Sequence, residues 1–568
     1  MNRSYPRRML WAAMLAIMLI VSACGSNSGG VSSSPTNPPA NALTIKFLYT
    51  SEKKAWVEAA TQAFNAANYK TASGKIVQVE LEVTGSVESV TRIVDGSSQP
   101  ALWSPASRLV IPILNDEWVQ KNGTELVDDG QCKDGVLSPL VIMMWQPFAE
   151  ALGWPKQQIG WADIAKLATS PNGWADYGKP QWGAFRFGHT HPDYSNSGLQ
   201  TIVALAYAAT GKLRGLSESD VTTAATADFI KKVESSVAHY GSSTGFFGTA
   251  MIERGPTYLS AAAVYESVVV SSYSAIKKST DGFPLVAIYP KEGTFMSDHP
   301  LCIPNAAWVT SDQKEAAGIY RDYLLSKPIQ EQALQLGFRP GDTDIAIASP
   351  IDIDHGVDPT QPQNLLAVPS AATTRAIRTV WSEQKRQVNL TMLIDISGSM
   401  KNENRIAGAR EGAAAFIQQL APTDNLTIIL FDDKQTILYD NVNVGEKRDD
   451  MIKDVGTIVP KGGTALFDSI AVAVETMKKD PTRINAVVVM TDGQDTNSER
   501  YRQASGLMDA LTGNPESSDS DVSIFTIGYG SDADENVLKT IADRGRGAYF
   551  KGTVENIAQV YRDMSTFF

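Results

Sequence analysis

Residues 389–400 read NLTMLIDISGSM, an apolar run that ends in one carboxylate and two serines. An uninterrupted apolar run of this length, closed by small polar residues, is typical of a strand that is buried on both faces of a sheet. A second run, AVVVM at 486–490, leads into Thr491-Asp492-Gly493. We therefore expect two buried strands whose ends carry oxygen-bearing side chains.

The rest of this third of the chain alternates between the two periodicities. Helical spacing predicts helices, and β-branched runs predict strands of which the second and third form a hairpin. Such alternation indicates an α/β domain with a parallel sheet covered by helices on both faces. The predicted helices are 405–420, 469–477 and 557–564, and the predicted strands are 389–394, 426–431, 435–439, 486–490 and 522–527.

Oxygen-bearing side chains are expected to meet at one edge of that sheet. Ligand sites of such sheets lie beyond the carboxyl ends of the strands. Carboxylate and hydroxyl oxygens without Cys or His suit Mg²⁺, Mn²⁺ or Ca²⁺ rather than zinc, and we expect Mg²⁺ first. The candidate metal ligands are Asp395, Ser397, Ser399, Thr464 and Asp492.

These residues also carry a resemblance. In order and spacing, Asp-x-Ser-x-Ser at 395–399, Thr464 and Asp492-Gly493 resemble the metal-ion-dependent adhesion site of von Willebrand factor A domains. The resemblance covers about 389–568 and implies a doubly wound, Rossmann-like fold. It further implies that the hydroxyls coordinate directly and the carboxylates directly or through water, with one position left for a carboxylate of a partner protein. A metal-free A-type domain, with these side chains as caps and turns, is the alternative.

Residues 42–345 show a second pattern. Strands predicted at 43–49, 77–83 and 101–104 each run into small hydroxyl residues at the start of a helix. Helix starts of this kind bind anions and polar ligands. A second α/β block follows the buried run at 138–145. The pattern therefore favours a ligand-binding domain.

The order of these elements resembles two-lobed bacterial extracellular solute-binding proteins, in the branch that includes molybdate- and sulfate-binding proteins. The resemblance implies a clamshell with lobe 1 at 42–137 plus 299–345 and lobe 2 at 138–298. Residues 140–144 and 300–303 would be neighbouring hinge strands. That arrangement would bring Cys132 and Cys302 together as a disulfide, with two separate buried thiols as the alternative.

The same resemblance implies which side chains line the cleft. Alternative roles remain open, because Ser51 and Ser197 could be helix caps and Glu266 could form a hinge salt bridge. Aromatic residues near the expected cleft loops, Trp103, Trp145, Phe187 and Tyr194, suit an organic solute better than a small anion. The implied cleft residues are Ser51, Ser86, Ser104, Ser197, Glu266 and Tyr289.

The N-terminal segment has the features of an export signal. Three arginines precede an apolar run at 9–21, which is too short to span a bilayer. The run ends in Val21-Ser22-Ala23-Cys24-Gly25, which resembles the bacterial lipobox. This implies a signal peptide at 1–23, a lipid on Cys24 and a Ser/Gly/Pro-rich tether at 24–41 on the outer face of the cell membrane. A plain secretory signal is the alternative.

Composition limits the function. The net charge of −12 argues against a nucleic-acid partner. With five histidines, three cysteines and no catalytic signature, we expect a binding protein rather than an enzyme. A linker with a connecting helix, at 346–388, would join the clamshell to the A-type domain. The alternative function is the receptor of an ABC-type importer with the A-type domain as an accessory.

Overall fold

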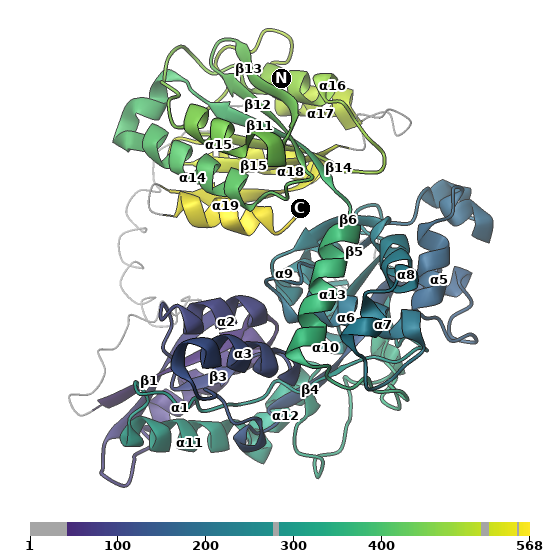
Figure 1. The fold of residues 1–568 in the computed structure, drawn as a ribbon, viewed down its shortest axis with the longest axis vertical. Coiled ribbons are helices and arrows are strands. Elements are labelled where there is room, and N and C mark those ends of the chain that lie inside the picture. The colour runs from purple at the N-terminus through teal and green to yellow at the C-terminus, as the bar shows by residue number, and fades with distance from the viewer. Residues whose placement is uncertain (1–41, 277–282, 513–521, 554–555) are drawn as a thin grey trace, which may run out of the picture. The chain divides into compact units, whose positions relative to one another are not determined.

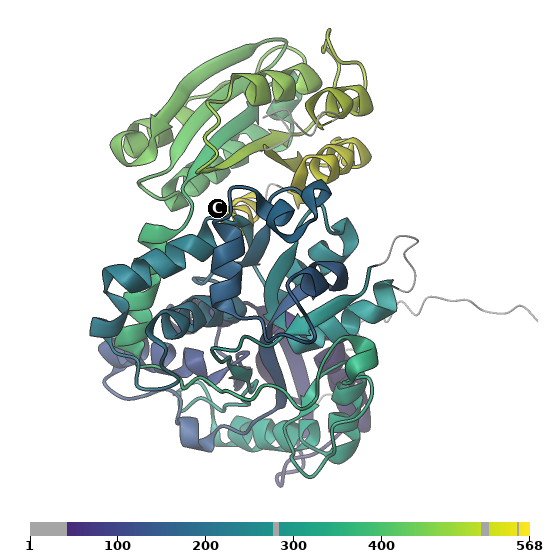
Figure 2. The same ribbon diagram turned by 90° about the vertical axis from the view of Figure 1, so that its right-hand side faces the viewer.

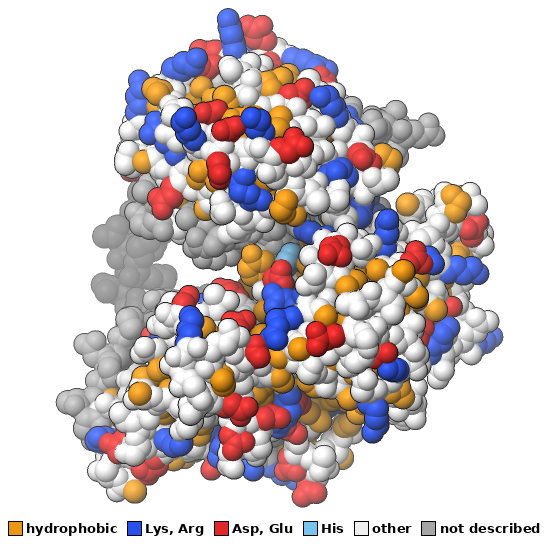
Figure 3. All heavy atoms as spheres, viewed as in Figure 1, with side chains coloured by type: hydrophobic (Ala, Val, Ile, Leu, Met, Phe, Trp, Pro, Cys, Tyr) orange, Lys and Arg blue, Asp and Glu red, His pale blue; other side chains and the backbone are white. Residues whose placement is uncertain are grey.

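The computed structural model describes residues 42–276, 283–512, 522–553 and 556–568 (Figure 1). Cys24 and the tether at 24–41 lie outside these ranges. None of the described helices combines the length and hydropathy needed to cross a membrane. On the face shown in Figure 3, acidic and basic side chains are interspersed.

Lobe 1 of the clamshell is built on a three-stranded sheet of order β2-β1-β3, in which β1 and β3 are parallel. The apolar face of α1 covers this sheet, because Trp56, Val57, Ala60 and Phe64 are spaced at helical intervals and are buried. Its elements are β1 (Ala42–Thr50), α1 (Lys54–Ala67), β2 (Ile76–Thr84), α2 (Ser86–Val94), β3 (Leu102–Ser104), α3 (Ile111–Asn122), α11 (Ser311–Leu324) and α12 (Lys327–Gln335).

Lobe 2 is built on a sheet of order β10-β4-β7-β5-β6, with β8 and β9 also paired to β4. Helices flank this sheet (Figure 2). Its elements are β4 (Val136–Trp145), α4 (Gln146–Ala151), α5 (Trp161–Ala168), β5 (Phe187–Thr190), α6 (Asn196–Thr210), α7 (Glu218–Val221), α8 (Ala224–Glu234), β6 (Val237–Gly241), α9 (Thr244–Arg254), β7 (Ala261–Tyr265), α10 (Glu266–Ile276), β8 (Leu285–Ile288), β9 (Met296–Ser297) and β10 (Arg339–Pro340).

The expected pairing of the two hinge strands is wrong in its register. Residues 140–144 of β4 pair with β7 and β8 inside lobe 2. The returning segment pairs instead with residues that precede this run in the chain. Leu301 pairs with Lys133, and Cys302 pairs with Trp103 of β3. The backbone hydrogen bonds along the buried run of β4 are made with β7, which is rich in alanine. The returning segment therefore pairs with a residue just before β4.

The segment at 346–370 has little regular structure but packs against the clamshell. Ile351 and Val357 are each only 1% exposed, and the Tyr207 hydroxyl donates to the Ala367 carbonyl. The connecting helix α13 (Ala371–Gln384) follows, and its N-cap Ser370 accepts from the Thr373 amide. This segment is therefore part of the folded domain.

The C-terminal domain has a six-stranded sheet of order β13-β12-β11-β14-β15-β16. All neighbours are parallel except the β12–β13 hairpin. Its elements are β11 (Val388–Asp395), α14 (Arg405–Gln419), β12 (Asn425–Phe431), β13 (Gln435–Asn443), α15 (Val444–Val455), α16 (Leu466–Thr476), β14 (Ile484–Thr491), α17 (Ala504–Thr512), β15 (Ser523–Tyr529), α18 (Glu535–Arg544), β16 (Arg546–Gly552) and α19 (Ile557–Ser565).

Two hydrophobic layers hold this sheet. Successive residues of β11 and β14 point to opposite faces, so both faces of each strand are apolar. Met392 and Val488 pack with α14, α15 and α19, whereas Leu393 and Val489 pack with α16, α17 and α18 (Figure 1). The expected α/β architecture with helices on both faces is confirmed.

Candidate functional site

The five predicted metal ligands lie together at the carboxyl ends of β11 and β14. These strands are parallel neighbours with Ile394 opposite Met490, so Asp395 and Asp492 emerge at the same edge. The Ser397 and Ser399 hydroxyl oxygens are 2.9 Å apart, and Ser399 donates to Asp492 Oδ1 at 2.7 Å. The parallel pairing of β11 and β14 therefore brings residues that are far apart in sequence into one cluster.

Asp395 is fully buried and doubly hydrogen-bonded. Its Oδ1 accepts from the Ser397 amide at 2.7 Å, and its Oδ2 accepts from the Thr491 hydroxyl at 2.5 Å. Burial raises the pKa of Asp395 to about 6, and the nearby Asp492 charge adds to the rise, while the bonds from Thr491 and Ser397 oppose it. Two carboxylates at 0% exposure favour a neighbouring positive charge.

Thr464 is brought to the cluster by a glycine loop. The Gly398 amide donates to the Gly462 carbonyl at 3.0 Å, and a Cβ added to Gly493 would lie 3.7 Å from both the Ser399 and the Thr464 hydroxyl oxygens. Thr464 is 5% exposed, and no residue in the described ranges hydrogen-bonds to its hydroxyl. This oxygen is available to a ligand.

Two further residues shape that loop. Asp433 Oδ1 accepts from the Gly463 amide at 2.9 Å, and a Cβ on Gly463 would meet Asp433 and Asn497 within 2.6 Å. Asp433, which follows β12, thus holds the glycine loop that precedes Thr464. A side chain at position 463 would therefore displace the Asp433 and Asn497 side chains.

The donor set fits a hard divalent ion. It offers two carboxylates and three hydroxyls, the oxygen ligands that Mg²⁺ and Ca²⁺ prefer. Within the part of the chain that the structure describes, no three His, Cys, Asp or Glu side chains gather as a metal site. An ion at this edge would thus depend on the serine and threonine oxygens as well as on the two aspartates.

Arg405, at the start of α14, is a site residue that sequence reasoning missed. It is 2% exposed, and its Nη1 lies 3.0 Å from Asp492 Oδ2 and 3.0 Å from Asp532 Oδ2, while its Nη2 lies 3.1 Å from Glu403 Oε2. Gly530, at φ +90°, makes room for the guanidinium, since a Cβ there would lie 2.9 Å from Arg405 Cζ. The guanidinium therefore ties Asp492 to the loop after β15.

In the clamshell, three of the implied cleft serines are used inside the protein. Ser86 Oγ accepts from the Ala106 amide at 3.0 Å, and Ser104 Oγ donates to the His299 carbonyl at 3.3 Å. Ser197 Oγ bonds to the Thr190 hydroxyl at 2.7 Å and accepts from the Thr244 hydroxyl at 2.8 Å. These hydroxyls hold loops in place.

Glu266 and Tyr289 belong to one buried ion-pair cluster. Arg339 donates to Glu266 Oε1 at 2.8 Å and to Oε2 at 2.6 Å, and the Tyr289 hydroxyl also donates to Glu266. Burial and the Glu266 charge raise the pKa of Tyr289 well above its usual value. Glu266 therefore forms a buried salt bridge, as its alternative role predicts, and the bridge joins α10 to β10.

Ser51 differs from the other five, because it lines a cavity between the lobes. The aromatic residues expected near the cleft mostly lie in the core: Trp103, Trp145 and Phe187 are at most 3% exposed. The fourth, Tyr194, reaches lobe 1 through its backbone, since its carbonyl accepts from the Val87 and Glu88 amides at 3.2 and 3.3 Å.

Comparison with known proteins supports this division of the chain. The model of the bacterial extracellular solute-binding protein family matches residues 45–339, more than half of the 568 residues. The chain belongs to this family. The model of the von Willebrand factor type A domain matches residues 388–550, so this solute-binding protein carries a C-terminal A domain.

Solved structures and a curated protein resemble parts of this solute-binding protein. The sulfate-binding protein SubI from Mycobacterium tuberculosis is 19% identical, with a TM-score of 0.40, over 59% of this chain and 98% of that one. A von Willebrand factor type A protein from Catenulispora acidiphila is 21% identical, with a TM-score of 0.29, over 32% of this chain and 42% of that one. An uncharacterized Synechocystis sp. protein is 24% identical over 198 residues, 35% of this chain and 43% of its own length. The chain thus spans less than half of this curated relative.

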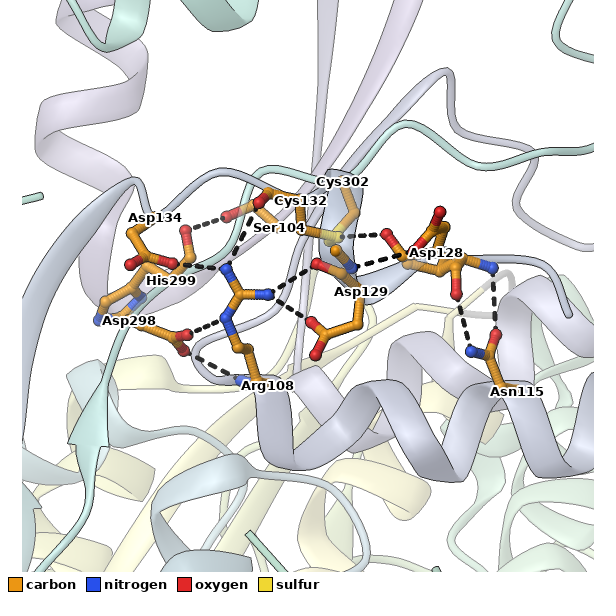
Figure 4. The surroundings of a disulfide bond; sticks show 12 residues. Ser104, Arg108, Asn115, Asp128, Asp129, Cys132, Asp134, Asp298, His299 and Cys302 are labelled. Atoms are coloured by element: carbon orange, nitrogen blue, oxygen red, sulfur yellow. Dashed lines mark hydrogen bonds and ion pairs between the residues drawn. A yellow bond between two sulfur atoms is a disulfide. The ribbon is translucent and has the colours of Figure 1, made fainter. Parts of the chain in front are cut away.

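A disulfide closes lobe 1 of the solute-binding domain (Figure 4). Cys132 and Cys302 are bonded with their Cα atoms 4.5 Å apart, although they lie 170 positions apart in the sequence. Beside it, Arg108 bonds Asp134 and Asp298, each at 2.6 Å, and also Asp129. Burial raises the pKa of Asp298 to about 6 although the Arg108 charge opposes the rise. The disulfide and Arg108 together fix the returning segment to lobe 1.

Proposed function

We propose that this protein is a binding protein with two ligand sites. The clamshell takes an extracellular small-molecule solute. The A domain holds a divalent ion, Mg²⁺ first, that bridges to a carboxylate of a partner protein. The observation that carries the second part is the buried cluster in which Asp395 and Asp492 meet three hydroxyls at one sheet edge.

Charge supports an ion at this edge. Asp492, Asp532 and Glu403 surround a single guanidinium, Arg405, and the Asp492 charge also acts on Asp395. A divalent ion would offset two of the remaining negative charges, and Thr464 offers an uncommitted oxygen. A partner carboxylate would complete the coordination of the ion.

We propose binding rather than catalysis. The Ser397 hydroxyl, the nearest candidate nucleophile, bonds to Ser399 rather than to a base. We further propose that the protein is exported and anchored to the outer face of the cell membrane through a lipid on Cys24. The lipobox-like sequence and the extracellular character of the family support this location.

Substitution of Asp395 tests the metal bridge. The full mature chain carrying Asp395→Ala or Thr464→Ala should lose Mg²⁺-dependent capture of a surface protein, because the ion loses a ligand. Capture is measured from a cell-surface extract of the source bacterium with Mg²⁺ and with EDTA. Asp440→Ala, at an exposed aspartate of the same domain, is the matched control and should capture as the wild type does. Capture that resists EDTA and both site substitutions would refute the bridge.

The family match keeps importer function as a second candidate. If the protein is an importer receptor, cells that carry Asp395→Ala should still take up the solute. If it is a scaffold that needs its partner, uptake should not survive this substitution. Uptake by cells carrying each variant separates the two roles.

A further inference from the structure

A cavity of about 360 Å³ lies where the two lobes of the clamshell meet. Lobe 1 contributes the start of α1, lobe 2 contributes α9 and α10, and Leu336 and Phe338 line it from the segment before β10. This volume falls in the range of small-molecule sites. The side chains that line the cavity therefore indicate which class of solute the domain accepts.

Each lobe presents to this cavity one hydroxyl that has no partner. Ser51, directly after β1, and Ser267, at the start of α10, line the cavity, and their Oγ atoms are buried without a hydrogen bond among the described residues. Buried polar groups are rarely left unpaired. Because a hydroxyl both donates and accepts, a ligand that carries hydroxyl groups would satisfy both serines and would join the two lobes.

The charges beside the cavity balance. On α1, Glu58 lies 3.7 Å from Lys54, and their side chains are 52% and 48% exposed. The Glu52 carboxylate, which is 4% exposed, lies 3.8 Å from Lys53 Nζ and also accepts from the Thr50 hydroxyl. The cavity therefore presents no net charge to a ligand.

This balance favours an uncharged ligand. An ion of either sign that entered between the lobes would lose its water without gaining a counter-charge, which is unfavourable. A ligand with one charge of each sign, such as an amino acid, would have to separate Lys54 from Glu58. A ligand that bonds through hydroxyl groups alone needs neither change.

An exposed aromatic ring lies on the lobe 2 side of the cavity. Phe246, near the start of α9, is 65% exposed, whereas Trp56 and Phe338, which also line the cavity, are each 2% exposed. Aromatic faces cover apolar groups. A sugar ring combines a face of C–H groups with hydroxyl groups at its edge, so it matches both the Phe246 ring and the two free hydroxyls.

We propose that this cavity binds an uncharged carbohydrate, a monosaccharide or disaccharide held between the lobes. The proposal rests on the solute-binding role proposed above and names its ligand class. Phe246 covers the C–H face of a sugar ring, and Ser51 and Ser267 bond its hydroxyl groups from the two lobes.

Calorimetric titration of the full mature chain tests this class with two sets of probes. The uncharged probes are glucose, galactose, maltose and trehalose, and the charged probes are sulfate, glutamate and spermidine. We expect saturable binding of at least one sugar and no binding of the charged probes. Asp395→Ala should leave sugar binding intact, which separates this test from the metal site.

Two variants locate the site. Phe246→Ala should weaken sugar binding about tenfold, because the sugar loses its apolar cover, and Ser267→Ala should weaken it about fivefold, because one hydrogen bond is lost. The matched controls are Phe283→Ala, at an exposed phenylalanine of lobe 2, and Ser272→Ala, at a buried serine of α10 that donates to the Val269 carbonyl. Neither control position lines the cavity, so both should bind sugar as the wild type does.

The other outcomes overturn the proposal in distinguishable ways. Binding of a charged probe alone would refute the sugar class and keep the domain as a solute receptor. Sugar binding that Phe246→Ala and Ser267→Ala leave unchanged would refute this cavity as the site. Binding of none of the probes would refute the sugar class and count against the solute-binding role as well.

Discussion

Replacing Arg405 by Met should lower the free energy of unfolding of the A domain by about 3–5 kcal/mol in EDTA, the cost of breaking a buried ion pair from one side. The guanidinium is 2% exposed and contacts Asp492, which is 0% exposed. Met keeps much of the side-chain volume, so lost charge rather than lost packing dominates. Excess Mg²⁺ should restore part of the loss, because the ion takes over as the positive charge beside Asp492.

Hydrogen–deuterium exchange in β14 measures this change within the A domain. Arg500→Met is the control, since Arg500 is an exposed arginine that pairs with Glu475 on the same domain. It should change exchange little, because exposed ion pairs contribute about 0–1 kcal/mol. Equal effects of the two substitutions, or a loss at Arg405 that Mg²⁺ leaves unchanged, would contradict the role assigned to the guanidinium.

Reduction of the disulfide should destabilise the solute-binding domain by about 5 kcal/mol, the loop-closure value for 170 residues. The tryptophans after residue 41 all lie between Trp56 and Trp381, so urea unfolding followed by tryptophan fluorescence reports on this domain. The double variant Cys132→Ser with Cys302→Ser should behave as the reduced wild type does.

Alkylation gives the complementary result. Without reductant both thiols should be blocked, and with reductant both should react. Exchange in β14 of the A domain should not change and serves as the internal control. Two reactive thiols without reductant, or a urea midpoint that reductant does not move, would contradict the disulfide.

The cluster of carboxylates and hydroxyls could be predicted because its geometry follows from sequence order. Asp395 and Asp492 each end a buried strand, and neighbouring parallel strands place such ends side by side. Arg405 could not be found in this way, since its bond to Asp492 joins residues 87 positions apart through the fold. The available signal was a basic residue at the start of the helix that follows the Asp-x-Ser-x-Ser motif.

Polar helices were also missed. The sequence did not predict α15 and α18, because each buries only three residues and its remaining positions are mostly polar or charged. Their packing against the sheet, rather than a strong apolar pattern, defines them.

The clamshell cleft was less predictable than the cluster of carboxylates and hydroxyls in the A domain. Ser86, Ser104 and Ser197 start helices or end strands as expected, yet loops of the same protein already satisfy their hydroxyls. Whether a hydroxyl faces a ligand depends on how two lobes meet, which local sequence does not encode. Ser51 lines the cavity beside Gly245 of α9, where an added Cβ would lie 3.6 Å from the Ser51 backbone.

Calorimetric titration of Mn²⁺ and Mg²⁺ into the metal-stripped mature chain tests the central claim most directly. We predict one site in the wild type and in Asp440→Ala, and a loss of affinity of more than about 100-fold in Asp395→Ala, beyond the range of outer-shell residues. Absence of ion binding in the wild type, or equal affinity in Asp395→Ala, would contradict a metal-dependent A domain.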